Sequence, residues 1–287
     1  MNSPLKLNYK GLDMSDVIVT MKRYEVKYIL NKEQIEGLRE LLIGHMEIDK
    51  YGLTSIASLY YDTTDYRLIR TSIEKPEFKE KIRLRSYGIA NETSPVFLEL
   101  KRKAYGIVYK RRVQTTQDLV DKFFNYEGDI CADGQIAREI SYFRNYYELL
   151  VPSCLIIYDR IAYFEKDGDL RLTIDYNPRF RTNNLNLSTS MDGTSLLDDG
   201  YAILEIKVQE AIPLWLASIL SQLKIYQGSF SKYGEAYKIQ VKNYLNSKGI
   251  TNYVWFNFFN KNIVWFDSLN DGLKFNKWNS VFFYYFI

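Results

Sequence analysis

The stretch VFLELKRKAYGIVYKRRVQ, residues 96–114, contains two short runs in which charged residues alternate with other residues. Glu99 and Lys101 are separated by one leucine, and Lys110 and Arg112 are separated by one arginine. Because successive side chains of a β-strand point to opposite faces, both members of each pair project from the same face. The stretch therefore predicts two strands that share an ionic face.

The same spacing recurs from one end of the chain to the other, and with the exception of Arg111 the intervening residues are apolar. The further pairs are Glu25 and Lys27, Arg83 and Arg85, Glu205 and Lys207, and Arg171 with Asp175 beyond Thr173. Many strands with few helices between them favour an antiparallel sheet or closed barrel with helices packed outside. We therefore expect an α+β fold.

Two arrangements of the ionic face are consistent with this pattern. The ordinary one is a sheet with an apolar core face and a salt-bridged solvent face. Solvent faces of strands usually mix threonine, serine and glutamine with their charges, whereas these positions are almost all Arg, Lys or Glu. The repetition favours the second arrangement, in which the sheet closes with its ionic face inward and forms a polar tunnel.

Local patterns place the individual elements. Asn31 is a predicted helix N-cap, and Pro213 is predicted to open a later helix. The predicted strands are residues 23–30, 56–61, 80–87, 96–102, 106–114, 154–164, 169–176 and 201–208, and the predicted helices are residues 32–43, 135–149, 213–223 and 232–246. We expect a flexible lead-in over residues 1–20, one domain over 21–250, and a tail over 251–287.

The tail differs in composition, because three of the four tryptophans lie there among many phenylalanines and asparagines. Lysines and aspartates interrupt it, so it lacks the apolar run of roughly 20 residues that a membrane span requires. We expect a peripheral packing segment, and an interfacial membrane contact is the alternative.

The inventory of residues excludes several functions. A formal net charge of +3 is too small to mark a general nucleic-acid or membrane binder, so we expect no nucleic-acid partner. The one histidine, His45, excludes an HExxH zinc site, and its place after a predicted helix suggests a surface or capping role. Two cysteines, Cys131 and Cys154, cannot form a disulfide framework, and the first residues lack a signal-peptide core. We expect a cytoplasmic protein.

An ionic tunnel of this composition suits phosphate chemistry. Arginine forks pair bidentately with phosphate oxygens and lysines supply point charges. Carboxylates placed among them suit a hard cation such as Mg²⁺ or Mn²⁺. Phosphoryl transfer requires positioning, neutralisation of charge and a metal that bridges phosphate oxygens. The pattern therefore predicts a metal-dependent site for a chain of phosphates.

At this point the sequence resembles the VTC polyphosphate polymerase domain, a member of the triphosphate tunnel metalloenzymes, also called CYTH-like proteins. The resemblance runs from about Arg23 to Gly234. The motifs that carry it, in order, are RYEVKY at 23–28, SLYYDT at 58–63, KIRLRSYG at 81–88, FLELKRK at 97–103, YDRIAY at 158–163, LRLTID at 170–175, AILEIKV at 202–208 and SFSKY at 229–233.

The resemblance implies an eight-stranded antiparallel barrel and a set of site residues. Those implied to grip phosphates and act in catalysis are Lys27, Arg83, Arg85, Lys101, Arg160, Arg171, Lys207 and Lys232. Further substrate-binding residues are expected to be Lys110, Arg112, Tyr158 and Ser231, and the expected metal ligands are Glu205, as the main one, and Glu99. Ser231 and Lys232 also begin a predicted helix, whose free N–H groups attract phosphate.

One departure concerns the choice of reaction. The hydrolase and cyclase branches carry Glu-x-Glu-x-Lys on the first strand, and here Arg23 replaces the first glutamate. The loss of one carboxylate favours gripping a long anion over activating water. We therefore expect a polymerase that transfers the γ-phosphoryl group of ATP to polyphosphate with Mn²⁺ or Mg²⁺. The alternatives are a tripolyphosphatase or nucleoside triphosphatase on the same fold, and a non-catalytic polyphosphate-binding module. The sequence does not identify any protein partners.

Overall fold

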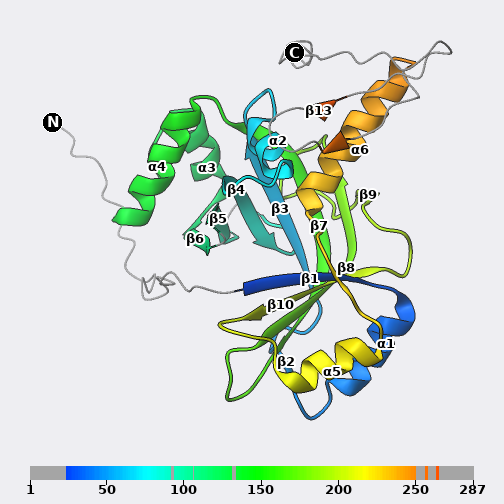
Figure 1. Cartoon of the computed structure of the whole chain (residues 1–287). Coiled ribbons are helices and arrows are strands. Elements are labelled where there is room, and N and C mark those ends of the chain that lie inside the picture. The colour runs from blue at the N-terminus through cyan, green and yellow to red at the C-terminus, as the bar shows by residue number, and fades with distance from the viewer. Residues whose placement is uncertain are drawn as a thin grey trace.

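A computed structural model describes residues 24–91, 94–105, 107–130, 134–249, 256–257 and 263–264. Its centre is one sheet of eleven strands in which every pairing is antiparallel (Figure 1). The order along the sheet is β11-β1-β10-β8-β7-β3-β4-β5-β6, with β2 paired to β7 and β9 paired to β8. A separate pair joins β12 to β13.

The elements have the following bounds. The strands are β1 Tyr24–Leu30, β2 Glu47–Ile48, β3 Thr54–Asp62, β4 Phe78–Tyr87, β5 Val96–Ala104, β6 Ile107–Thr115, β7 Val151–Phe164, β8 Arg171–Arg181, β9 Thr194–Ser195, β10 Ala202–Val208, β11 Gln227–Gly228, β12 Phe256–Asn257 and β13 Ile263–Val264. The helices are α1 Lys32–Leu41, α2 Arg67–Ile73, α3 Gln117–Phe124, α4 Gln135–Tyr147, α5 Leu214–Gln222 and α6 Lys232–Ser247.

The antiparallel α+β prediction is confirmed, and each of the eight predicted strands overlaps a long strand of the sheet. The structure adds the two-residue strands β2, β9 and β11 to that sheet. The eight-stranded closed barrel is not confirmed, because the strand order is open and ends at β11 and β6. The sheet nevertheless curls, since Lys101 of β5 and Glu25 of β1 form an ion pair of 2.7 Å across it.

Helix α1 follows the prediction closely. The side chain of Asn31 accepts a hydrogen bond from the backbone of Gln34, and the Gln34 side chain accepts one from the backbone of Asn31. This reciprocal capping box satisfies two N–H groups that the first turn of a helix leaves without partners. The predicted helix at 135–149 ends slightly earlier, at Tyr147, because Glu148 adopts a positive φ of 59°.

Helices α2 and α3 were not predicted. Helix α2 has no side-chain cap of its own at Tyr66, and the carboxylate of Asp62 accepts from the backbone N–H groups of Leu68 and Ile69 instead. Asp62 ends strand β3 and is fully buried. The start of α2 is therefore stabilised by a residue outside the local window in which a helix start is normally recognised.

The apolar faces of the strands pack against helices in three clusters. Helices α3 and α4 cover β4 and β5, and α1 and α5 lie together over β1 and β10 (Figure 1). The third cluster places α6 against β3 and β7, where Tyr60 and Tyr158 contact the aromatic face of the helix. Tyr60 is the cross-strand neighbour of Arg83. Helix α6 therefore lies on the same side of the sheet as the predicted ionic face.

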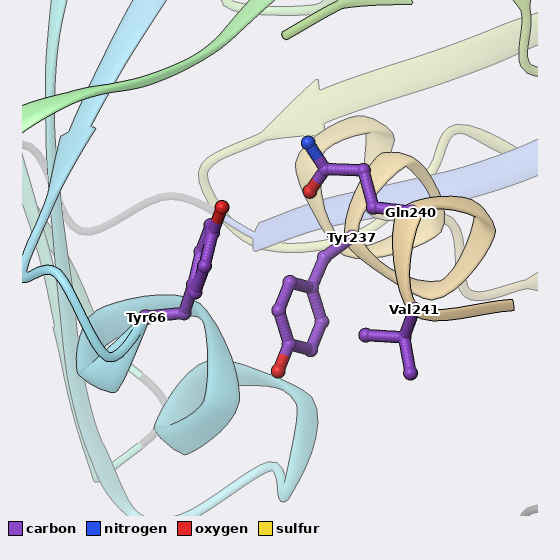
Figure 2. A pocket seen from close by; sticks show the side chains of 4 residues that line it. All are labelled: Tyr66, Tyr237, Gln240 and Val241. Atoms are coloured by element: carbon purple, nitrogen blue, oxygen red, sulfur yellow. The ribbon is translucent and has the colours of Figure 1, made fainter. Parts of the chain in front are cut away.

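A small cavity separates α6 from α2. Tyr66, the N-cap residue of α2, and Tyr237, Gln240 and Val241 of α6 line it (Figure 2). Its volume of about 40 Å³ has room for one or two water molecules. None of the residues predicted for the site lines this cavity, so it is a packing defect between helices and not the site itself.

Two further predictions can be placed. His45 stacks on Trp215 with ring centroids 4.3 Å apart, which agrees with a surface role. Across the described part of the chain, none of the helices combines the length and the apolar character that crossing a membrane requires. The predicted lead-in over 1–20 and nearly all of the tail over 251–287 lie outside the described residues, as does Arg23.

Candidate functional site

Glu99 on β5 is the centre of a group of basic side chains. Its neighbours across the sheet are Arg83 on β4 and Arg112 on β6. The carboxylate lies 2.8 Å from Arg83, 3.7 Å from Arg85, 2.7 Å from Lys110 and 3.3 Å from Arg112, and Glu99 is only 1% exposed. Burial alone would raise its pKa, but Arg83, Arg85 and Lys110 outweigh burial and hold the pKa well below its ordinary value.

A second group forms where β1 and β10 pair. The register places Lys27 beside Glu205 and Glu25 beside Lys207. Glu205 lies 3.5 Å from Lys27 and 2.8 Å from Lys207, while Glu25 pairs with Lys101 at 2.7 Å. Burial raises the pKa of Glu205, yet the two lysines and Arg160 lower it well below the ordinary value. The same register makes Glu25 and Glu205 diagonal neighbours on one face of the two strands.

Asp175 on β8 is the centre of a third group. Arg160 donates to both of its oxygens, and Lys232 at the start of α6 donates to Oδ2. Asp175 is fully buried. Burial raises its pKa, but the positive charges of Lys232 and Arg160 outweigh burial and lower the pKa to about 2. The pairing brings α6 to the same centre as the central strands.

Tyr158 connects the groups. Its hydroxyl accepts a hydrogen bond of 3.1 Å from Arg85, and Lys232 lies 4.4 Å from the centre of its ring. Burial would raise the pKa of Tyr158, but Arg85 and Arg160 bring it down to about 8. The ordinary tyrosine value is near 10. A phenol with so low a pKa reports a strongly positive surrounding potential.

The N-terminus of α6 borders the site. Ser231 is the N-cap, and its hydroxyl accepts from Gly234 N at 3.2 Å and from Lys81 Nζ at 3.2 Å. Lys27 donates to the carbonyl of Phe230 at 3.2 Å, which fixes the segment before the helix. The positive end of the helix dipole therefore adds to the charge of Lys232 at one place.

Tyr233 anchors this helix end from behind. Its hydroxyl donates to Asp62 Oδ2 at 2.8 Å and lies 2.7 Å from Ser153 Oγ, and its ring stacks on Tyr60. Tyr60 in turn accepts a hydrogen bond from Arg83 at 2.9 Å. The anchor and the central arginines are thus linked through one pair of aromatic rings.

Most of the predicted site residues meet in these groups. Arg171 is at the margin, because its guanidinium donates to the turn carbonyls of Gly168 and Leu170 and lies over the ring of Phe164. Arg112 stacks on Phe97 at 3.7 Å and donates to Tyr87. Its position is therefore fixed by aromatic contacts as well as by Glu99.

Several members of the site were not predicted. They are Glu25, Tyr60, Lys81, Asp175 and Tyr233. Glu25 and Asp175 belong to the alternating charge pairs already, so their spacing carried a signal. Tyr60 and Tyr233 carry no such signal, because each acts through a stack that only the folded chain creates.

Positive charge dominates the site. Nine basic side chains contact four carboxylates, Glu25, Glu99, Asp175 and Glu205; the nine are Lys27, Arg83, Arg85, Lys101, Lys110, Arg112, Arg160, Lys207 and Lys232. No group of three or more His, Cys, Asp or Glu side chains placed to hold a metal ion is found among the described residues. The arrangement is suited to binding a compact, highly charged anion.

Comparisons with known proteins agree with this picture. A family model described as the VTC domain matches residues 22–241, a range that includes every predicted site residue. No curated protein matches the sequence.

Solved structures with a similar chain path include three enzymes or enzyme candidates. A candidate adenylate cyclase from Bacillus halodurans is 13% identical, with a TM-score of 0.47 over 74% of this chain and 95% of its own. A candidate adenylyl cyclase from Hippeastrum, reported to show a dominant triphosphatase activity, is 15% identical, with a TM-score of 0.47 over 74% of this chain and 93% of its own. A candidate adenylate cyclase from Vibrio parahaemolyticus is 11% identical, with a TM-score of 0.41 over 76% and 99%.

Proposed function

This chain belongs to the VTC domain family, and from that premise we propose that it transfers the γ-phosphoryl group of ATP to the end of an inorganic polyphosphate chain. A terminal phosphate oxygen of the chain attacks the γ-phosphorus, the bond to the β-phosphate oxygen breaks, and ADP leaves. The polyphosphate grows by one unit, so atoms and charge balance without a further reactant.

The observation that carries the proposal is the excess of cations around buried carboxylates. Arg83 and Arg85 on β4 and Arg160 on β7 present guanidinium groups toward one region, where the N-terminus of α6 adds Lys232. Such donors bind phosphate oxygens bidentately and neutralise the charge that develops during phosphoryl transfer. We assign phosphate binding to these residues and to Lys27, Lys101, Lys110, Lys207 and Ser231.

The carboxylates of the site favour phosphate over water as the nucleophile. A general base works best when its pKa is near the working pH. Arginine and lysine side chains hold the pKa of Glu99, Asp175 and Glu205 below their ordinary values, so these carboxylates are weak bases. Attack by a phosphate oxygen that is already ionised needs no strong base, whereas activation of water does.

The donor chemistry of the site fits a divalent cation at one place. The register of β1 and β10 makes Glu205 and Glu25 diagonal neighbours on one face, and Mg²⁺ or Mn²⁺ commonly binds one or two carboxylates together with substrate phosphates. We propose that these two residues hold the metal. When bound, the ion would supply charge to the phosphate oxygens, while Lys27 and Lys207 orient the carboxylate of Glu205.

Glu99 fits that role poorly, although it was expected to be a second metal ligand. Four basic side chains pair with its carboxylate, against two at Glu205 and one at Glu25, so the repulsion of a divalent cation would be strongest at Glu99. We propose instead that Glu99 positions the arginines of the central strands.

The decisive experiment is a product analysis with ATP and Mn²⁺. The proposal predicts ADP together with polyphosphate that lengthens with time. ADP with free phosphate would identify a triphosphatase, and binding of both anions without turnover would identify a non-catalytic module. Either of these outcomes would contradict the polymerase proposal.

A further inference from the structure

The side chains of β4 that face the site form a row, and this row continues past the site toward the surface. Arg85, Arg83, Lys81 and Lys79 alternate with apolar or outward residues and so share one face. Arg85 is buried, Lys81 and Lys79 are half-buried, and Lys103 on the neighbouring strand β5 is exposed. The row therefore leads from the interior to the outside.

Like charges face one another along this part of the sheet. The register places Lys81 directly opposite Lys101 and Lys79 directly opposite Lys103. Like charges at opposite positions of two strands are unfavourable. Among the salt bridges of the described residues, none involves Lys79, Lys81 or Lys103. Lys79 donates to the carbonyl of Ser72 and Lys81 to the hydroxyl of Ser231, so both contacts are to neutral oxygens.

The nearest acidic residue in sequence does not relieve this repulsion. Glu80 lies between Lys79 and Lys81 and projects from the opposite face. There its carboxylate pairs with Arg102 at 2.8 Å and accepts from Tyr147 at 2.9 Å. The outer face of β4 and β5 is thus neutralised while this part of the inner face is not.

The ionisation of these lysines reflects the same imbalance. Burial lowers the pKa of Lys81 to about 7, and the charges that add to this effect are those of Lys79, Lys27, Lys101 and Arg83. Burial also lowers the pKa of Lys79, with Lys103, Lys75 and Lys101 contributing. Every named neighbouring charge is positive, so a bound polyanion would remove an existing repulsion.

We propose that Lys79, Lys81 and Lys103 form a lysine track that binds the part of a polyphosphate chain extending beyond the site. This inference rests on the proposed function, because it takes the chain to be the substrate and product of that site. It adds a second region of binding that only chains longer than the site can reach.

The change from arginine to lysine along the row fits this role. Arginine holds phosphate in a fixed bidentate geometry, whereas lysine is a flexible point charge that tolerates many positions of the same anion. The phosphates at Arg83 and Arg85 are therefore held in a defined position, while the lysines allow the rest of the chain to shift. Retention by the lysine track would keep a growing chain bound between successive additions.

The test compares short and long anions in one variant. In Lys79→Gln with Lys103→Gln, the dissociation constants for tripolyphosphate and for a polyphosphate of many tens of units are measured without ATP. Lys81 is left intact because it contacts Ser231. Wild type should bind the long chain more tightly than tripolyphosphate. The ratio of the two dissociation constants is the advantage of the long chain, and it should be about tenfold smaller in the variant. Its affinity for tripolyphosphate should change by less than about twofold. The melting temperature of the variant without ligand checks that it is folded.

The matched control is Lys242→Gln with Lys248→Gln, which removes the same charge from two exposed lysines near the far end of α6. It should retain the full advantage of the long chain. An unchanged advantage in the Lys79 and Lys103 variant would overturn the lysine track and leave the proposed function standing. Failure of wild type to bind either anion would overturn the proposed function. An equal loss of affinity for a single-stranded oligonucleotide of similar charge would overturn the assignment to polyphosphate.

Discussion

Glu205 is held between Lys27 and Lys207, and its replacement by glutamine tests the proposed metal site. Glu205→Gln should keep the fold and lower metal-dependent turnover to about one hundredth of the wild-type value or less, because a neutral amide binds a hard cation poorly. Turnover is measured across a Mn²⁺ titration, with Glu36→Gln on the exposed side of α1 as the control. Wild-type rates in Glu205→Gln would rule out this metal ligand.

Asp175 gives a prediction about acid stability. Its folded pKa of about 2 lies below the ordinary 3.8, so its carboxylate contributes stability that is present above pH 4 and is lost as pH falls toward 2. The full shift corresponds to about 2 kcal/mol. Asp175→Asn should be less stable than wild type at pH 7, and its loss of stability between about pH 5 and pH 3 should be smaller by about 1 kcal/mol.

Denaturant unfolding at the two pH values measures this difference. Asp198→Asn, on an exposed turn, serves as the control and should follow wild type. Equal acid sensitivity in Asp175→Asn and wild type would show that the pairing of Asp175 with Arg160 and Lys232 does not stabilise the fold.

What the sequence could predict about single residues depended on spacing. The alternating charges identified Arg83, Arg85, Lys101 and Lys207, because period-two spacing fixes which face a side chain occupies. The same spacing could not say which carboxylate would be surrounded by cations. That property of Glu99 depends on cross-strand neighbours contributed by β4 and β6.

At the scale of an element, helix α6 is positioned by Tyr233. Tyr233→Phe keeps the ring that stacks on Tyr60 and removes the hydroxyl that donates to the buried carboxylate of Asp62. Loss of one partner of a buried charged group costs about 1 to 3 kcal/mol. The variant should lose stability by this amount and also show a lower kcat, because Ser231 and Lys232 directly precede the anchor.

Thermal or denaturant unfolding and initial rates are measured on the same preparations. Tyr142→Phe, at an exposed position of α4, is the matched control. Unchanged stability and rate in Tyr233→Phe would show that α6 is positioned by its apolar contacts alone.

Elements were predictable where their signals were local. Asn31 and Gln34 form the capping box that the N-cap prediction requires, and α1 begins where it was placed. Helix α2 was missed because the N–H groups of Leu68 and Ile69 donate to Asp62 at the end of a strand, and not to a side-chain cap at Tyr66. Helix α3 carries a local cap at Thr116, and its eight residues were too short to stand out as a periodic segment.

For the whole molecule, the excess of positive charge links stability to ligand and salt. Saturating tripolyphosphate, at about 100 times its Kd, should raise the free energy of unfolding by roughly 2.7 kcal/mol. Orthophosphate should raise it much less, and added salt should weaken the response to tripolyphosphate. The measurement is the melting temperature in each anion at two salt concentrations.

The variant Arg83→Ala with Arg85→Ala tests the same property. The repeated cations alone suggest that this variant melts no lower than wild type, but both arginines contact the buried carboxylate of Glu99. We therefore expect a lower melting temperature without ligand and a largely lost response to tripolyphosphate, with Arg138→Ala on α4 as the control. A full response in the double variant would place these arginines outside the ligand site.

The last prediction concerns the boundary of the active unit. Every residue assigned to the site precedes the end of α6 at Ser247. A chain that ends at Gly249 should therefore retain most of the catalytic rate of the full chain, measured under the same conditions. A well-folded but inactive truncation would show that residues after Gly249 contribute to the site.

The open strand order has a consequence for how a long chain is admitted. Within the described strands, backbone ladders do not join β6 to β11 or β1, while the side chains of Lys101 and Glu25 meet across the curled sheet. A partly exposed ion pair contributes little to stability, so it joins the two edges far less firmly than a backbone ladder would. On the proposed function, a polyphosphate with both ends blocked should therefore bind without being threaded through a closed ring of strands.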